Sequence, residues 1–193
     1  MSYDKVVKKT VEGEAVHYGL IVGNEKIVFI KTGAGGSIKG YKDKYLNMAH
    51  RIHDRMGATV LCASNPDVDH RAVDKAMISQ MASEINGSGC EVYFVGVSDG
   101  AYHNLVLAKE IPETVKVLGI NTSRKTAEDF KEKVCALAHV KTILVYGTKD
   151  YESDIVPTLQ EFAGDNLEII PVEGADHQFH GMPEEFIALT DLL

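Results

Sequence analysis

Three residues of this sequence have the types and spacing of a nucleophile, its base and the acid that orients the base. Ser98 is the centre of the segment Gly96–Gly100, which reads G-x-S-x-G, while Asp150 and His177 each follow a glycine by three residues. A serine hydroxyl is a weak nucleophile unless an imidazole takes its proton, and the imidazole needs a carboxylate that fixes its tautomer. Together, these residues predict attack by Ser98 on an acyl group, with His177 as the base and Asp150 as the orienting acid.

Each of these residues follows a short apolar segment that we predict to be a strand. The segments are Glu91–Val97, Lys141–Tyr146 and Leu167–Val172. In a parallel sheet the carboxyl ends of the strands meet at one edge, where ligands bind. We therefore expect the serine, the acid and the histidine to lie together at this edge.

The glycines on both sides of Ser98 are expected at a sharp turn from a strand into a helix. Such a turn holds the serine in a strained conformation with an exposed hydroxyl, and Cβ atoms on Gly96 and Gly100 would obstruct its packing. A plain glycine-flanked turn with a serine that caps the helix is the alternative. A helix predicted over Asp99–Lys109 is compatible with both interpretations.

A second glycine-rich loop, Thr32–Ser37, follows the predicted strand Lys26–Ile30. Glycine lets the backbone approach a ligand closely and direct N–H groups at negative charge. We expect the amides of Ala34 and Asp99 to hold the oxyanion of a tetrahedral intermediate. A nucleotide site is the competing interpretation, but G-x-G-x-x-G from Gly33 would need glycine at position 38, where this chain has isoleucine.

The remaining pattern predicts an α/β fold with a mainly parallel, doubly wound sheet and helices on both faces. From about residue 32 onward, short apolar segments alternate with helical periodicity. Before that point we predict antiparallel strands over Lys5–Val11 and Glu14–Ile21, with a turn at Gly13 and a second hairpin through Gly23-Asn24. No repeat or linker interrupts the chain, so residues 1–193 are expected to form one domain.

Two further strands and five further helices complete this prediction. The strands are Thr59–Cys62 and Val115–Ile120. Asn86–Gly89 is expected to end one of the helices. The helices are Tyr45–Met56, Arg71–Ile85, Thr126–Leu137, Val156–Phe162 and a last one after Pro183.

These motifs resemble the α/β-hydrolase superfamily, in particular its small single-domain members, over nearly the whole chain. The resemblance implies a serine hydrolase that works through an acyl-enzyme without a metal or an organic cofactor. Large cap domains of the family usually enter after the strand that follows the helix of the serine turn. In this chain only 20 residues separate the end of that strand, Ile120, from the next strand, which begins at Lys141. We therefore expect an open site without a lid. Thr32 departs from the lipase-like branch, which often carries a histidine at that point.

Neighbouring residues leave some assignments open. Glu152 or Asp154 could replace Asp150 as the acid, and His180 could replace His177 as the base, because loop geometry decides which side chain faces the serine. Four other residues could line the substrate pocket: Gly35, Tyr102, His103 and Phe179.

The carboxylate of Asp99 has two interpretations. Beside the nucleophile, it would disfavour anionic acyl groups and favour cationic or neutral ones. Alternatively, it is a solvated acid in the first helical turn, stabilised by the helix dipole.

Composition argues against several classes of function. The chain carries 20 Lys and Arg against 28 Asp and Glu, a net charge of −8, and no basic run exceeds a pair, so nucleic acid is not an expected partner. No apolar segment approaches the about 20 residues that span a bilayer. The start lacks a signal-peptide pattern, which fits a cytoplasmic protein. The three cysteines are interpreted as small core residues: Cys62, Cys90 and Cys135.

No metal site is predicted. His50 and His53 lie three residues apart on one predicted helix, and Asp67–His70 precedes another, but neither set has further convergent ligands. We expect a cytoplasmic serine hydrolase that cleaves an ester, thioester or similar acyl bond of a small substrate. A non-catalytic binding or scaffolding domain with the same fold is the alternative. The oligomeric state is left open.

Overall fold

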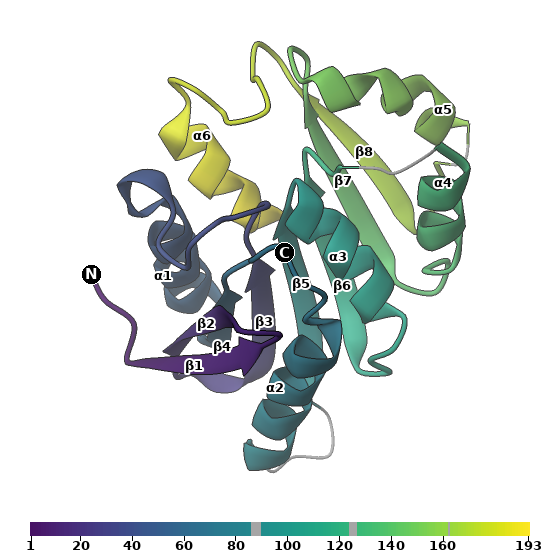
Figure 1. The fold of residues 1–193 in the computed structure, drawn as a ribbon. Helices are drawn as coiled ribbons and strands as arrows, with labels where there is room; N and C mark the ends of the chain where they lie inside the picture. The colour runs from purple at the N-terminus through teal and green to yellow at the C-terminus, as the bar shows by residue number, and fades with distance from the viewer. Residues whose placement is uncertain (86–89, 124–126, 162) are drawn as a thin grey trace.

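The computed structural model describes residues 1–85, 90–123, 127–161 and 163–193, which are built around one sheet of eight strands (Figure 1). The strand order is β1-β2-β4-β3-β5-β6-β7-β8. The strands are β1 (Lys5–Val11), β2 (Glu14–Ile21), β3 (Asn24–Lys31), β4 (Ala58–Ala63), β5 (Glu91–Val97), β6 (Thr114–Ile120), β7 (Lys141–Gly147) and β8 (Leu167–Val172).

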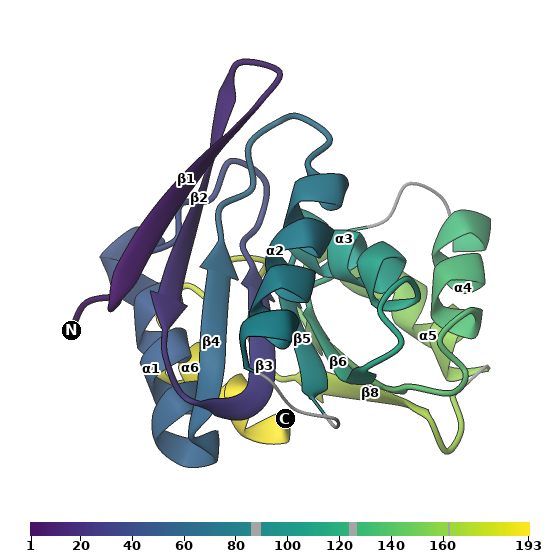
Figure 2. The same ribbon diagram turned by 90° about the horizontal axis from the view of Figure 1, so that it is seen from below.

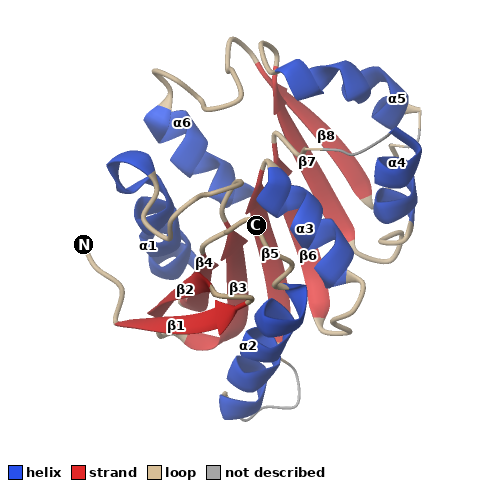
Figure 3. Ribbon diagram, in the orientation of Figure 1, coloured by secondary structure: helices blue, strands red, loops and turns tan. Residues whose placement is uncertain are grey.

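The sheet is parallel from β4 to β8, and β1 and β2 are antiparallel at one edge. All six residues of β4 are buried, as expected for a strand covered on both faces. The helices, blue in Figure 3, flank the sheet. They are α1 (Lys44–Met56), α2 (Arg71–Glu84), α3 (Asp99–Ala108), α4 (Ala127–Cys135), α5 (Val156–Gln160) and α6 (Pro183–Ala188), with short 3₁₀ turns at Tyr41–Asp43, Tyr151–Ile155 and Leu189–Leu192.

Two apolar cores lie on opposite faces of the sheet. One contains buried side chains of α2, α3, α4 and α5, and the other contains those of α1 and α6. Figure 2 shows α1 and α6 on one side of the strands and the other four helices on the opposite side. The predicted doubly wound α/β fold is therefore confirmed.

The predicted hairpin through Gly23-Asn24 is wrong. β2 and β3 do not pair, because β4 lies between them, antiparallel to β2 and parallel to β3. A Cβ atom on Gly23 would lie 2.2 Å from the carbonyl oxygen of Gly57, and the Asn24 amide donates to the same oxygen at 2.7 Å. Gly23 thus permits close contact with the segment before β4. The predicted turn at Gly13 is confirmed, since Val11 pairs with Glu14 across it.

The cysteine prediction is correct only in part. Cys62 is buried in β4, Cys90 is half-buried, and Cys135 is exposed at the end of α4. In α4, Phe130 and Val134 face the core. Cys135 follows Val134 directly and therefore lies on the side of the helix that faces solvent.

Several predicted helix ends lie outside the described residues, namely Asn86–Gly89, Thr126 and Phe162. Among the described residues, no helix combines the length and the apolar character required to cross a bilayer.

Candidate active site

Ser98 occupies a strained turn between β5 and α3. Its φ of 54° and ψ of −123° lie in a region that residues with a side chain rarely adopt. A Cβ atom on Gly96 would lie 2.3 Å from the Ala101 Cα, and one on Gly100 would lie 2.2 Å from the Thr32 carbonyl oxygen. Both glycines are therefore required for β5, α3 and the loop after β3 to pack this closely.

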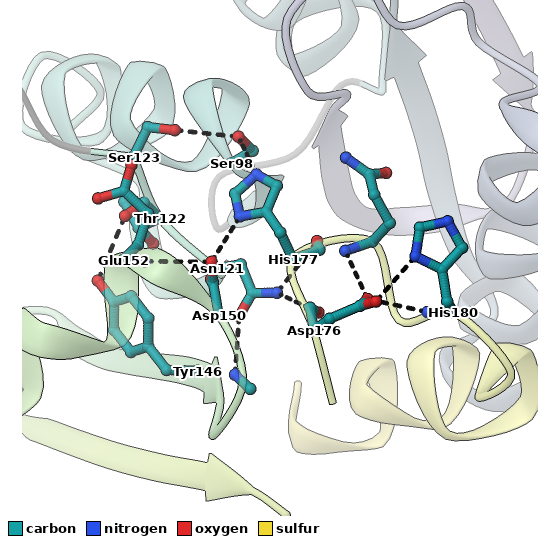
Figure 4. A network of polar contacts seen from close by, with 12 residues as sticks. Ser98, Asn121, Thr122, Ser123, Tyr146, Asp150, Glu152, Asp176, His177 and His180 are labelled. Atoms are coloured by element: carbon teal, nitrogen blue, oxygen red, sulfur yellow. Dashed lines mark hydrogen bonds and ion pairs between the residues drawn. The ribbon is translucent and has the colours of Figure 1, made fainter. Parts of the chain in front are cut away.

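Hydrogen bonds connect Ser98 to His177 and His177 to Asp150 (Figure 4). The Ser98 Oγ lies 2.9 Å from His177 Nε2, and His177 Nδ1 lies 2.8 Å from Asp150 Oδ1. Because a carboxylate only accepts, Nδ1 carries the proton and Nε2 presents a lone pair to the serine hydroxyl. Asp150 is 3% exposed, and its Oδ1 also accepts from the Glu152 amide at 3.1 Å. This arrangement can remove a proton from Ser98.

The structure places His177, and not His180, beside Ser98. The His180 side chain is 76% exposed, and its Nδ1 lies 2.8 Å from Asp176 Oδ2. In Figure 4 the His180 side chain lies on the far side of the His177 loop from Ser98. The pKa of Asp176 is lowered to about 2, chiefly because the His180 amide donates to its carboxylate. Asp176 therefore remains charged and holds the turn after His177.

Asn121, which our sequence analysis missed, supports the histidine loop. It is buried at the end of β6, and its φ of 47° is one that asparagine tolerates better than most residues. Its Nδ2 donates to the carbonyl oxygens of Asp176 and His177, both at 3.1 Å, and its Oδ1 accepts from the Gly147 amide at 2.9 Å. One side chain thus connects the histidine loop to the end of β7, close to Asp150.

Two further side chains contact the serine and the histidine. Ser123 Oγ lies 3.0 Å from Ser98 Oγ. The Tyr151 ring stacks on His177 with centroids 4.6 Å apart. Neither residue belongs to a recognisable motif, although the position of Tyr151 directly after Asp150 could have drawn attention to it.

The Thr32–Ser37 loop lies against the serine turn, since a Cβ atom on Gly33 would be 3.6 Å from the Ser98 Cβ. Within the described part of the chain, the amides of Ala34 and Asp99 donate to no acceptor. The Gly35 amide instead donates to the Asn65 carbonyl oxygen at 2.7 Å. The Ala34 and Asp99 amides are therefore free to bind an anion, whereas that of Gly35 is not.

A cleft of about 480 Å³ opens next to the serine turn and is lined in part by Asp99, Tyr102 and His103. The Asp99 carboxylate accepts from Asn65 Nδ2 at 3.0 Å. Phe179 lines a different cavity, of about 690 Å³, between the histidine loop and α1. Of the residues predicted to line a pocket, only Tyr102 and His103 thus share a cleft with Asp99.

The charges around this cleft are unevenly compensated. Arg71 and Lys133 each pair with a neighbouring carboxylate, at 2.6 and 3.3 Å. Asp67 and Asp99 also line the cleft, and neither has a cation within ion-pair distance among the described residues. The cleft therefore presents uncompensated negative charge at Asp67 and at Asp99, the residue after Ser98.

A buried polar cluster lies behind the cleft. Asp74 Oδ2 is 2.8 Å from Lys31 Nζ and 2.9 Å from His103 Nε2, while Asp74 Oδ1 accepts from the Tyr18 hydroxyl at 2.6 Å. His70, Asp74 and His103 hold their ligand atoms within 4.8 Å of one another, the spacing of a metal site. The Lys31 ammonium, however, already occupies the same carboxylate and would repel a second cation.

Comparison with known proteins shows that this chain is similar in structure to several solved proteins. Neither a protein-family model nor a curated protein matches this chain. A structure described as an α-β serine hydrolase homologue from Coxiella burnetii is 16% identical with a TM-score of 0.73, covering 100% of this chain and 99% of that one. Est1E from Butyrivibrio proteoclasticus is 12% identical with a TM-score of 0.68, covering 97% and 96%.

A third match is a Xanthomonas campestris protein described as an α/β serine hydrolase without a lid. It is 14% identical with a TM-score of 0.69, covering 99% of this chain and 94% of that one. In the present chain, the described residues between β6 and β7 contain one helix, α4. At these identities the likeness establishes the fold and not the activity.

Proposed function

We propose that this chain, which has the α/β-hydrolase fold, is a serine hydrolase that cleaves an ester, thioester or similarly activated acyl bond of a small substrate. The observation that carries this proposal is the hydrogen-bonded series Ser98–His177–Asp150, with distances of 2.9 and 2.8 Å. The three residues come from the carboxyl ends of different strands, where ligands bind in such sheets.

In the acylation step, Ser98 Oγ forms a bond to the carbonyl carbon of the substrate while its proton passes to His177 Nε2. Asp150 stabilises the imidazolium that results. The carbonyl oxygen becomes an oxyanion, which the free amides of Ala34 and Asp99 can hold. When the tetrahedral intermediate collapses, the bond to the leaving group breaks, and the leaving group takes the proton from His177.

In the deacylation step, water attacks the acyl carbon and gives a proton to His177 Nε2. The bond between the acyl carbon and Ser98 Oγ then breaks, and the serine regains its proton from His177. A carboxylic acid leaves, and the resting arrangement is restored. Every proton transfer in the two steps passes through the His177 imidazole.

The cleft beside Asp99 supports a preference for substrates with a positive charge. Asp67 and Asp99 have no cationic partner among the described residues, so an ammonium group near them would gain favourable electrostatic energy. Anionic acyl groups would be repelled by the same carboxylates.

A fluorophosphonate probe tests the proposed function, because it labels only an activated serine. We expect stoichiometric labelling of the wild-type chain, with the adduct located at Ser98 by peptide mass spectrometry. The Ser123→Thr and Ser83→Ala variants, which retain Ser98, should still be labelled. A folded wild-type chain that resists the probe would refute the proposal and favour a non-catalytic binding domain.

A further inference from the structure

The hydroxyl of Ser123 contacts the proposed nucleophile without belonging to the predicted site. Ser123 follows β6, and its amide donates to the Ser98 carbonyl oxygen at 3.2 Å. Its Oγ lies 3.0 Å from Ser98 Oγ, and the residue is half-buried. The backbone contact places Ser123 next to the serine turn, and its hydroxyl lies beside the Ser98 hydroxyl in Figure 4.

The direction of this hydrogen bond follows from the protons available. Asp150 can only accept, so the neutral His177 ring donates from Nδ1 and accepts at Nε2. Ser98 has one hydroxyl proton, and it donates that proton to His177 Nε2. Ser123 must therefore donate its own proton to a lone pair of Ser98 Oγ.

We propose that Ser123 is a further catalytic residue, whose hydroxyl stabilises the negative charge that develops on Ser98 Oγ. This inference rests on the proposed function. In acylation, charge builds on Oγ as its proton moves to His177, before the bond to carbon is complete. In deacylation, the same charge appears as the bond between carbon and Oγ breaks, and it disappears when His177 returns the proton.

The reaction becomes faster because the hydrogen bond from Ser123 to Ser98 Oγ strengthens as Oγ becomes negatively charged. Hydrogen bonds to ionised groups are roughly twice as strong as those between neutral groups. Such a contact stabilises the transition state more than the resting enzyme, which is the condition for faster chemistry. A residue that only filled space beside Ser98 would give no such difference.

The experiment compares the wild-type chain with Ser123→Ala, Ser123→Thr and Ser83→Ala. Ser83 is an exposed serine of α2 whose hydroxyl bonds to its own helix, so its variant controls for loss of a hydroxyl elsewhere. The measurements are the second-order rate of fluorophosphonate labelling, the burst and steady-state rates with p-nitrophenyl acetate, and the urea unfolding midpoint.

We expect Ser123→Ala to slow labelling, the burst and the steady-state rate by about tenfold each. The KM for p-nitrophenyl acetate and the urea unfolding midpoint should change little. Ser123→Thr keeps the hydroxyl and should recover most of the rate, while Ser83→Ala should match the wild type.

Two results would overturn the inference while leaving the proposed function intact. One is a Ser123→Ala variant that reacts at the wild-type rate. The other is a Ser123→Thr variant that loses as much rate as Ser123→Ala, which would indicate a packing role. A wild-type chain that is not labelled at all would overturn both proposals together.

Discussion

Asp99 places a carboxylate at the edge of the cleft, one residue after Ser98. Its hydrogen bond with Asn65 at 3.0 Å fixes the side chain without neutralising it, because an amide carries no charge. The two interpretations of this residue, a specificity determinant and a solvated helix acid, differ in their consequences for charged substrates.

We expect the wild-type chain to hydrolyse glycine p-nitrophenyl ester several-fold faster, in kcat/KM, than the similarly sized p-nitrophenyl propionate. The preference should shrink between about 10 mM and 1 M salt, since screening weakens attraction between solvent-exposed charges. Because the α-ammonium group also activates its own ester, the informative quantity is the ratio of the two kcat/KM values in the wild type compared with the same ratio in Asp99→Asn, which keeps the shape of the side chain. Asp99→Asn should lower this ratio several-fold, and a ratio that is unchanged in the variant, or that does not respond to salt in the wild type, would exclude this role.

Residue types and spacing were sufficient to identify Ser98, Asp150 and His177 as candidates, because each follows a strand at a glycine-rich turn. The same reasoning left His180 and Asp154 open, since only the folded loops decide which side chain faces the serine. Asn121 and Ser123 were missed for a different reason. They follow β6, whose carboxyl end carries no glycine motif, and they reach the site only because β6 lies beside β5 in the sheet.

Among the elements, the junction of β5 with α3 positions Ser98, the proposed nucleophile. α3 begins directly after Ser98, and the backbone at Gly100 packs against the end of β3 at Lys31 and Thr32. The loop with the free Ala34 amide continues from there. The strain at Ser98 is therefore maintained by close contacts among β5, α3 and the end of β3.

Replacing Gly100 with alanine should disrupt this junction. The new Cβ atom would lie 2.2 Å from the Thr32 carbonyl oxygen and 2.5 Å from that of Lys31, and both are backbone atoms that cannot rotate away. We expect a loss of about 3 kcal/mol in the free energy of unfolding, measured in urea.

The matched control is Gly164→Ala. A Cβ atom at Gly164 would meet nothing within 4 Å, so the free energy of unfolding should change by less than about 0.5 kcal/mol. Equal stability of the two variants would show that the close packing at Gly100 is not required.

For the strands, the local sequence pattern predicted their positions in the chain better than it predicted which strands pair with each other. The bounds of β5 and β8 agree with the prediction. β5 is a buried parallel strand, which appears in the sequence as a continuous apolar segment with clear ends. Gly23-Asn24 carried an equally clear turn signal, yet β2 and β3 do not pair. The deciding contact is the insertion of β4 between them, a long-range pairing that the turn residues do not encode.

In the whole molecule, the connection between β6 and β7 is where the resemblance to α/β-hydrolases would place a large cap domain. Its described residues contain α4 and no further helix or strand. The cleft beside Asp99 has a polar lining that includes Asp67, His103 and Lys133. Such a site offers little apolar surface to a long acyl chain.

Short acyl groups should therefore be hydrolysed at least as well as long ones. Burial of apolar area contributes about 25 cal/mol per Å², and this gain requires a surface that covers the chain. We expect kcat/KM for p-nitrophenyl esters to be flat or to fall from acetate to dodecanoate, with micelle formation controlled by working below the critical concentration. A steady rise along this series would contradict an open site.

The central claim is that Ser98 is the nucleophile, and the most direct test is the kcat of Ser98→Ala with p-nitrophenyl acetate beside the wild type. We predict that the variant folds normally, with an unchanged circular dichroism spectrum and a urea unfolding midpoint no lower than that of the wild type. Its kcat should fall by at least about 10³-fold, the scale of loss when the serine of such an arrangement is removed. A folded Ser98→Ala variant that retains the wild-type kcat would contradict the account.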